Sequence, residues 1–460
     1  FFKDIGQLAK LWRWFGVDWP WSSRQPIWQH IKEHLHPSGV GLTEGGEKLP
    51  DEVLVTAGTA LSFAPGAFDG IWGGGRADDI ESNKLYEALL EAVSQGFGPS
   101  WAKLYEMLTE RSTLDYADDI IERIVEKRDV SASGLYALAR FLVERAPDRE
   151  PVKFGIALLG IFRHLDDRDI FMTLGRHDEF TLYCAVALSR TQSDPDIALW
   201  ELAQTVQGWG RVQVVERLAE TENEQIKRWL LRDGFKNTIM YQYVACTCAV
   251  TGGLLEELDC EAPDDELLDG ACELLAALAA GGPADDMDDY KDGPEATDKL
   301  LHHLTSRASK LEHFCAVAQL RLFLQADENT KPRPDEELGW SPELCRSLES
   351  RCDEILYRSW WPEQVRAALE ASVNVDELDE GQEQQFLLAA RAAKVLRLPT
   401  FRHHWRRLRR KPMIGTRWYL AIDNMGPNDV DKMVSFAERR LALDEIASGP
   451  AEVLGLGQQY

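Results

Sequence analysis

SASGLYALARFLVERAPDREPVKFGIALLGIFR, residues 131–163, contains two apolar segments separated by a short polar break. The first segment follows Ser131, a residue type that caps helix N-termini, and its apolar residues recur at the three- and four-residue spacing of one helix face: Leu135, Leu138, Phe141 and Leu142. The second, residues 149–163, is apolar on nearly all sides, as expected of a central buried helix. The stretch therefore predicts two helices joined by a short break.

The same alternation of helix and short break continues on both sides, from about Asn83 onward. We find no segment with the sustained two-residue alternation of a half-buried strand. Ile197 and Trp200 also recur 29 residues later as Ile226 and Trp229. Because each helical pair would bury its apolar face only against its neighbours, the pattern predicts an all-α protein, a HEAT-like α-solenoid of stacked antiparallel pairs.

Composition divides the chain into three predicted parts: 1–82, 83–325 and 342–460. The first is rich in Trp and Gly, with one helix expected at about Ser23–Leu35. The second is the helical array, in which Gly96 and Gly281 end helices and Asp264 or Asp265 begins one. The third follows a polar, Pro-containing stretch, and its apolar periodicity predicts four helices: 342–358, 362–371, 380–398 and 429–441.

The net charge of −26, from 77 acidic and 51 basic residues, repels phosphate backbones and attracts basic protein surfaces. Eight cysteines without C-x-x-C spacing, most of them inside apolar helical patterns, indicate free thiols in a reducing compartment. The first residues lack the apolar core of a signal peptide, and no apolar run reaches membrane-spanning length. We therefore expect a soluble cytoplasmic protein.

The sharpest enzymatic pattern is HIKEH, residues 30–34, which fits H-x-x-E-H. On a helix His30 and His34 would share a face and bind zinc, with Glu33 as the general base. The alternative is an exposed polar helix face, which we favour. We accordingly expect no metal, no cofactor and no enzymatic activity.

Two polar groups are candidates for partner binding. The acidic loop DDMDDYKD contains Asp285, Asp286, Asp288 and Asp289, but it lacks the ligand spacing of an EF-hand, so we expect a solvated loop. The second group combines residues from GRHDEF and GWGR, which would lie at the ends of stacked helices: Arg176, His177, Trp209 and Arg211. Helix capping and ion pairing are the alternative use of this group.

The one basic cluster is FRHHWRRLRRK, residues 401–411. Its cationic residues, interleaved with Trp405, would suit phosphate binding or base stacking. They are Arg402, Arg406, Arg407, Arg409, Arg410 and Lys411. In so acidic a chain the expected use is internal, as a basic helix that pairs with acidic neighbours. Nucleic-acid or nucleotide binding through this helix is the alternative.

Residues 150–300, from PVKFGIALLGIFR to EATDKLL, resemble a family of bacterial proteins that are sometimes labelled limonene hydroxylase. APGAFDGIWGG and IASGPAEVLGLG extend the resemblance. Terpene hydroxylation needs haem-thiolate, flavin or non-haem iron, but the chain contains neither a haem-binding cysteine loop nor a dinucleotide fingerprint. The resemblance therefore does not lead us to expect a hydroxylase.

These observations together predict a non-enzymatic helical-repeat protein that binds another protein. Solenoids present long concave surfaces for partners, and the net charge favours a partner with a basic face. A bacterial immunity protein or antitoxin that occludes its target would fit this description. The two alternatives are the metal-dependent hydrolase and the nucleic-acid or nucleotide binder.

Overall fold

The computed structural model describes residues 24–52, 66, 79–325, 336–373 and 380–447. Throughout these residues the regular secondary structure is helical, and the only strand-like feature is an isolated bridge between Leu35 and Leu42. The all-α prediction is confirmed. By its internal contacts the chain divides into two units, Phe1–Gly253 and Leu254–Tyr460. This division falls inside the predicted array 83–325.

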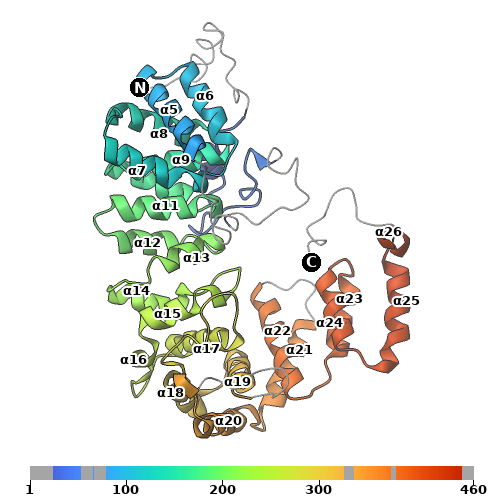
Figure 1. Ribbon diagram of the computed structural model, residues 1–460. Coiled ribbons are helices and arrows are strands. Elements are labelled where there is room, and N and C mark those ends of the chain that lie inside the picture. Colours follow the sequence, from blue (N-terminus) through green and yellow to red (C-terminus); the bar gives the residue numbers. More distant parts are fainter. Residues whose placement is uncertain (1–23, 53–65, 67–78, 326–335, 374–379, 448–460) are drawn as a thin grey trace. The chain divides into compact units, whose positions relative to one another are not determined.

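Unit 1 is a succession of mostly short helices in which neighbours along the chain pack together, for example α8 on α9 and α11 on both α12 and α13 (Figure 1). Its elements are α2 (Ile27–Glu33), α5 (Asp79–Gln95), α6 (Pro99–Thr109), η1 (Thr113–Asp115), α7 (Ala117–Lys127), α8 (Ala132–Arg145), α9 (Arg149–Leu159), η2 (Leu165–Asp167), α10 (Arg168–Leu174), α11 (Asp178–Thr191), α12 (Pro195–Ala203), α13 (Trp209–Glu216), α14 (Glu224–Trp229), the π-helix η3 (Leu230–Gly234), η4 (Tyr241–Tyr243) and α15 (Ala245–Gly252).

Unit 2 continues the succession with somewhat longer helices, and α19 packs on α17, α20 and α22. Its elements are α16 (Leu254–Leu258), α17 (Asp265–Ala280), α18 (Gly293–Arg307), α19 (Leu311–Leu324), η5 (Glu336–Leu338), α20 (Pro342–Leu356), α21 (Trp361–Val373), α22 (Glu380–Val395), α23 (Phe401–Arg410), α24 (Gly415–Asp423), η6 (Pro427–Asp429), α25 (Val430–Arg440) and α26 (Leu443–Ala447).

Several predicted helix ends are confirmed, with side chains that accept backbone N–H groups at helix starts and glycines of positive φ after helix ends. The side chain of Ser131 accepts the N–H of Gly134 at 3.3 Å, and that of Asp264 accepts the N–H of Leu267 at 2.7 Å. Gly96 and Gly281 follow α5 and α17 with φ of +73° and +68°, values that glycine adopts without steric cost. α2 differs from the expected Ser23–Leu35, because it is shorter at both ends and Pro26 takes the cap position.

α9 is the central helix of unit 1, as the sequence predicted. Val152, Phe154, Ile156, Leu158 and Leu159 are all fully buried. The tryptophans of α12 and α14, Trp200 and Trp229, contact each other, with ring centroids 6.4 Å apart.

Within unit 1, residues 24–52 are attached to the later helices by ion pairs and backbone hydrogen bonds. Arg24 pairs with Asp148 at 2.5 Å, and Asp51 lies 3.1 Å from Arg149. The N–H of Gly41 donates to the carbonyl of Thr205 at 2.8 Å. The rest of the predicted segment 1–82, apart from Gly66 and 79–82, lies outside the described residues, including five of its six tryptophans.

A buried ion-pair network joins this attachment to α9 and α11. The Lys153 ammonium lies 2.6 Å from Glu179 and 3.0 Å from Glu150, although its side chain is only 2% exposed. Burial alone would raise the pKa of Glu179, but Lys153 and Arg149 outweigh it and hold that pKa at about 2. Arg149 and Lys153 each pair with more than one carboxylate, and these pairs link α9 to α11 and to residues 51–52.

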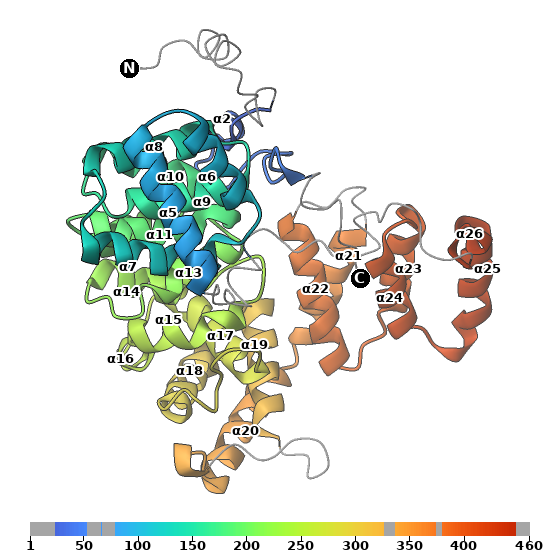
Figure 2. The same ribbon diagram turned by 45° about the horizontal axis from the view of Figure 1, so that its top comes forward.

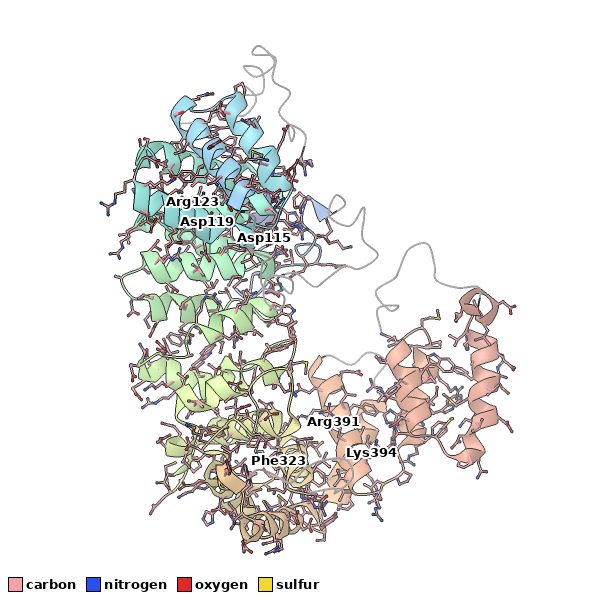
Figure 3. The ribbon with its side chains drawn as sticks, viewed as in Figure 1. Asp115, Asp119, Arg123, Phe323, Arg391 and Lys394 are labelled. Carbon is pink, nitrogen blue, oxygen red and sulfur yellow. The ribbon has the colours of Figure 1, made fainter. Side chains whose placement is uncertain are left out.

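The last helices of unit 2 form a small core of their own. Trp405 and Leu408 of α23, Ala421 of α24 and Met433 and Phe436 of α25 pack together. Two views show α24 beside α23 (Figures 1 and 2). A further link to the preceding helices is the pair Lys394–Asp423 at 3.5 Å, in which Lys394 projects from α22 (Figure 3).

None of the described helices is both long and apolar enough to cross a membrane.

Candidate anion-binding site

Part of the basic helix α23 pairs with acidic neighbours. Arg402 and Arg406 pair with Glu370 of α21, the second at 3.6 Å, and Arg407 pairs with Glu383 of α22. These pairs confirm the expectation of pairing with acidic neighbours. Burial lowers the pKa of His404 to about 4, so its ring adds no charge near neutral pH.

The side of α23 that carries Arg406, Arg409 and Arg410 lines a hollow of about 760 Å³ together with α25, so Arg406 both pairs with Glu370 and borders this hollow. Arg406, Arg409 and Arg410 lie three and four residues apart and therefore share one side of α23. On α25 the same spacing relates Lys432 and Phe436 to the two arginines that end the helix, Arg439 and Arg440. The hollow is lined by Trp405, Arg406, Arg409, Arg410, Lys432, Phe436, Arg439 and Arg440.

Two aromatic rings form the apolar part of this hollow, and both are almost covered. Trp405 is 8% and Phe436 is 6% exposed, and their rings meet edge to face at 5.0 Å. The Lys432 ammonium lies 4.6 Å from the Trp405 ring centre, and the Arg440 guanidinium lies 5.9 Å from that of Phe436. The faces of these rings are therefore used to support cations.

The charge of the hollow is uncompensated by its own lining. Of the eight lining residues that the structure describes, six are Lys or Arg and none is acidic. Within the described part of the chain, Arg409 and Arg439 form no hydrogen bond or ion pair and are exposed. Residues 401–440 contain ten basic and four acidic residues, whereas residues 254–400 contain 14 basic and 33 acidic ones. A cationic hollow of this kind concentrates anions next to an otherwise acidic chain.

The structure brings together only part of the zinc site that HIKEH, residues 30–34, suggested. The rings of His30 and His34 lie 4.4 Å apart, but one nitrogen of each faces a backbone carbonyl, of Gly46 and of His30 respectively. Glu33 is exposed and accepts hydrogen bonds from Gln25 and Gln29. Among the residues that the structure describes, no group of three potential ligands surrounds a common point.

The second group proposed for partner binding consists of Arg176, His177, Trp209 and Arg211. Three of these four residues are buried inside unit 1. His177 is 1% exposed, and its Nδ1 accepts the N–H of Glu179 at the start of α11. Trp209 is 6% exposed and contacts the ring of Tyr243 at 4.9 Å. Since these side chains serve the fold, they leave little surface for a partner.

Arg211 and Arg176 complete this group. Arg211 is 5% exposed, donates to the carbonyls of Ala203, Asp233 and Gly234, and stacks 4.6 Å from the centre of the Trp229 ring. Arg176 is half-buried, and its Nε has no hydrogen-bond partner among the described residues.

The nearby Asp178 holds the N-terminus of α13. Its Oδ1 accepts the N–H of Gly210 at 3.1 Å, and a Cβ added at Gly208 would lie 2.0 Å from its Oδ2. Burial, reinforced by the charge of Glu47, raises the pKa of Asp178 to about 7. The glycines of GWGR thus provide room for a buried carboxyl group.

The acidic loop is placed as a surface turn after α17. Asp285, Asp288 and Asp289 are exposed, and Asp286 is half-buried. The Asp286 carboxylate accepts the N–H of Asp288 at 2.9 Å, and that of Asp289 accepts the N–H of Asp286 at 3.0 Å. These bonds shape the loop and leave its negative charge facing solvent.

Comparison of the chain with models of protein families, with curated proteins and with solved structures gave no match. The resemblance noted for residues 150–300 therefore stays an expectation, and the function of the hollow is inferred from its geometry.

Sequence reasoning found one half of the hollow and missed the other. Lys432, Arg439 and Arg440 lie outside the basic run that marks α23. A signal was present, because these residues and Phe436 recur at helical spacing within the predicted helix 429–441. That this side of α25 lies opposite α23 depends on the short helix α24, which sequence reasoning did not predict.

Proposed function

We propose that the chain binds a ligand with clustered phosphate groups in the hollow between α23 and α25. The observation that carries this proposal is the concentration of six cationic side chains around one hollow, with no carboxylate among its described lining residues. Mutual repulsion makes such a cluster unfavourable in the free protein, and a bound polyanion relieves it. Arginine also presents a planar fork of donors that matches phosphate oxygens.

Titration calorimetry of the full chain with inorganic tripolyphosphate at low salt tests this proposal. We expect saturable binding that weakens as salt rises, because screening acts on exposed charges. The double variant Arg409→Gln, Arg439→Gln should bind at least about tenfold more weakly, since each charge-assisted contact to phosphate contributes on the order of 1.5–3 kcal/mol.

The matched control removes two arginines from exposed positions outside the hollow, Arg163 and Arg346. The double variant Arg163→Gln, Arg346→Gln changes the net charge equally and should bind as the unmodified chain does. Equal losses in both double variants would mean that overall charge governs binding. No heat in any sample would leave α23 and α25 as a solvated basic surface and refute the proposal.

A second candidate function is binding of a basic protein by the acidic surface of unit 2. Its support is the excess of acidic residues in 254–400, together with the exposed carboxylates of Asp285, Asp288 and Asp289. In this role the helical succession would act as an α-solenoid scaffold, to which the packing of consecutive helices is suited. A basic partner that co-purifies at low salt and is lost on Asp285→Asn, Asp288→Asn, Asp289→Asn would support this role.

A further inference from the structure

We infer that the ligand of the hollow is a compact chain of about three phosphates. The protein recognises its phosphates and not a base, and the site does not extend along a nucleic-acid strand. This inference rests on the proposed function and specifies its ligand. A nucleoside triphosphate and inorganic tripolyphosphate share this chemistry, and an oligonucleotide strand is the contrasting ligand.

The size of the cationic region fits such a ligand. From the helical rise, Arg406 to Arg410 extends over about 6 Å along α23, and Lys432 to Arg440 extends over about 12 Å along α25. The two rows line the same hollow of about 760 Å³, a volume within the range of small-molecule sites. Cations that converge from two helices surround a short ligand, whereas a long strand needs a continuous row.

Charges close to the hollow also oppose a long strand. The Glu370 carboxylate lies 3.6 Å from Arg406, at the margin of the hollow. On α25 itself, Asp431 and Glu438 are exposed beside the lining residues Lys432 and Arg439. A strand that extended beyond the six cations would meet these carboxylates and lose the electrostatic gain of further phosphates.

Among the described lining residues, neither aromatic ring offers an open face on which a base could stack. Stacking of a base requires an accessible ring face, but Trp405 and Phe436 are 8% and 6% exposed. Lys432 lies over the Trp405 ring at 4.6 Å. Affinity should therefore come from phosphate charge, and it should depend little on whether a nucleoside is attached.

Calorimetry of the full chain with three probes tests this inference: inorganic tripolyphosphate, ATP, and an oligothymidylate of about 20 nucleotides, which exceeds the site of a typical single-strand-binding fold. We expect tripolyphosphate and ATP to bind within about threefold of each other, and both to weaken at least about tenfold in Arg409→Gln, Arg439→Gln. The oligothymidylate should bind no more tightly than tripolyphosphate. The control variant Arg163→Gln, Arg346→Gln should behave as the unmodified chain.

Each contrary outcome has a separate meaning. Oligothymidylate binding at least about tenfold tighter than tripolyphosphate, with a steeper salt dependence, would overturn the compact ligand while leaving phosphate binding intact. ATP binding about tenfold tighter than tripolyphosphate would show that the nucleoside is recognised and would overturn base independence. If none of the three probes binds, the proposed function fails, and this inference fails with it.

Discussion

Replacement of Lys153 by methionine tests how strongly the buried network stabilises unit 1. Methionine keeps most of the side-chain volume and removes the ammonium, which lies 2.6 Å from Glu179 and 3.0 Å from Glu150. The Glu179 side chain, 12% exposed, would keep the more distant Arg149 guanidinium at 3.7 Å and the hydrogen bond from the Gly66 N–H at 3.2 Å. Loss of one partner from a buried ion pair typically costs about 3–5 kcal/mol, because the other charge stays buried and uncompensated.

The pKa of Glu179 gives an independent magnitude. A fall from the ordinary value of 4.5 to about 2 corresponds to about 3 kcal/mol of stabilisation of the ionised carboxylate in the folded state. Because this folded-state pKa is depressed, its contribution is complete above pH 4.5 and is lost as the pH falls toward 2. The cost of Lys153→Met should therefore shrink in acid, to less than about half at pH 3.

Urea unfolding followed by circular dichroism measures both effects. The matched control is Lys103→Met, since Lys103 pairs with Glu91 at 3.2 Å but is 62% exposed. We expect the control to lose no more than about 1 kcal/mol of unfolding free energy. Equal losses for Lys153→Met and Lys103→Met near neutral pH, or a loss for Lys153→Met that does not change with pH, would refute this account of the network.

Three further predictions concern unit 1. Gly208→Ala should lower the unfolding free energy by about 1–3 kcal/mol, because the new Cβ would lie 2.0 Å from Asp178 Oδ2. The control Gly415→Ala in α24, with nothing within 4 Å of its Cβ, should leave the stability in thermal unfolding almost unchanged. Ser131→Ala should cost about 1 kcal/mol by loss of the bond to Gly134, and Ser133→Ala, which leaves this cap in place, should be near neutral in the same assay. The pKa of Asp178 is raised from 3.8 to about 7 in the folded chain, so as the pH rises the unfolded chain loses this proton at a lower pH than the folded chain does. The unfolding free energy should therefore fall as the pH rises between these values. Asp178→Asn should lack this contribution, and an unchanged pH profile in that variant would contradict the assignment.

The sequence allowed prediction of the helical class and of several helix ends, because these depend on local chemistry. The residues that begin or end helices act on nearby backbone groups, as do Ser131, Asp264, Gly96 and Gly281. The apolar residues of 149–163 likewise indicate a buried helix, whichever helices pack against it. Short α24, between Pro412 and Gly426, has too few residues to give a clear periodic pattern.

Tertiary contacts account for what local patterns missed. His177, Trp209 and Arg211 have the residue types of a binding surface, but packing of α11 and α13 buries them. The roles of Lys153 and Glu179 depend on the packing of α9 against α11, which lie far enough apart in sequence that spacing does not reveal the ion pair. In the same way, Arg439 becomes part of a cationic hollow only because α25 packs next to α23.

Hydrogen–deuterium exchange of the full chain, with and without saturating inorganic tripolyphosphate, tests the location of the proposed site most directly. Because a ligand that binds the native state suppresses local opening where it binds, we expect slower exchange in peptides covering 401–410 and 430–440. The variant Arg409→Gln, Arg439→Gln should lose this protection at the same ligand concentration. Protection confined to other helices, or none in 401–410 and 430–440 when calorimetry shows saturation, would contradict the assignment of phosphate binding to the hollow between α23 and α25.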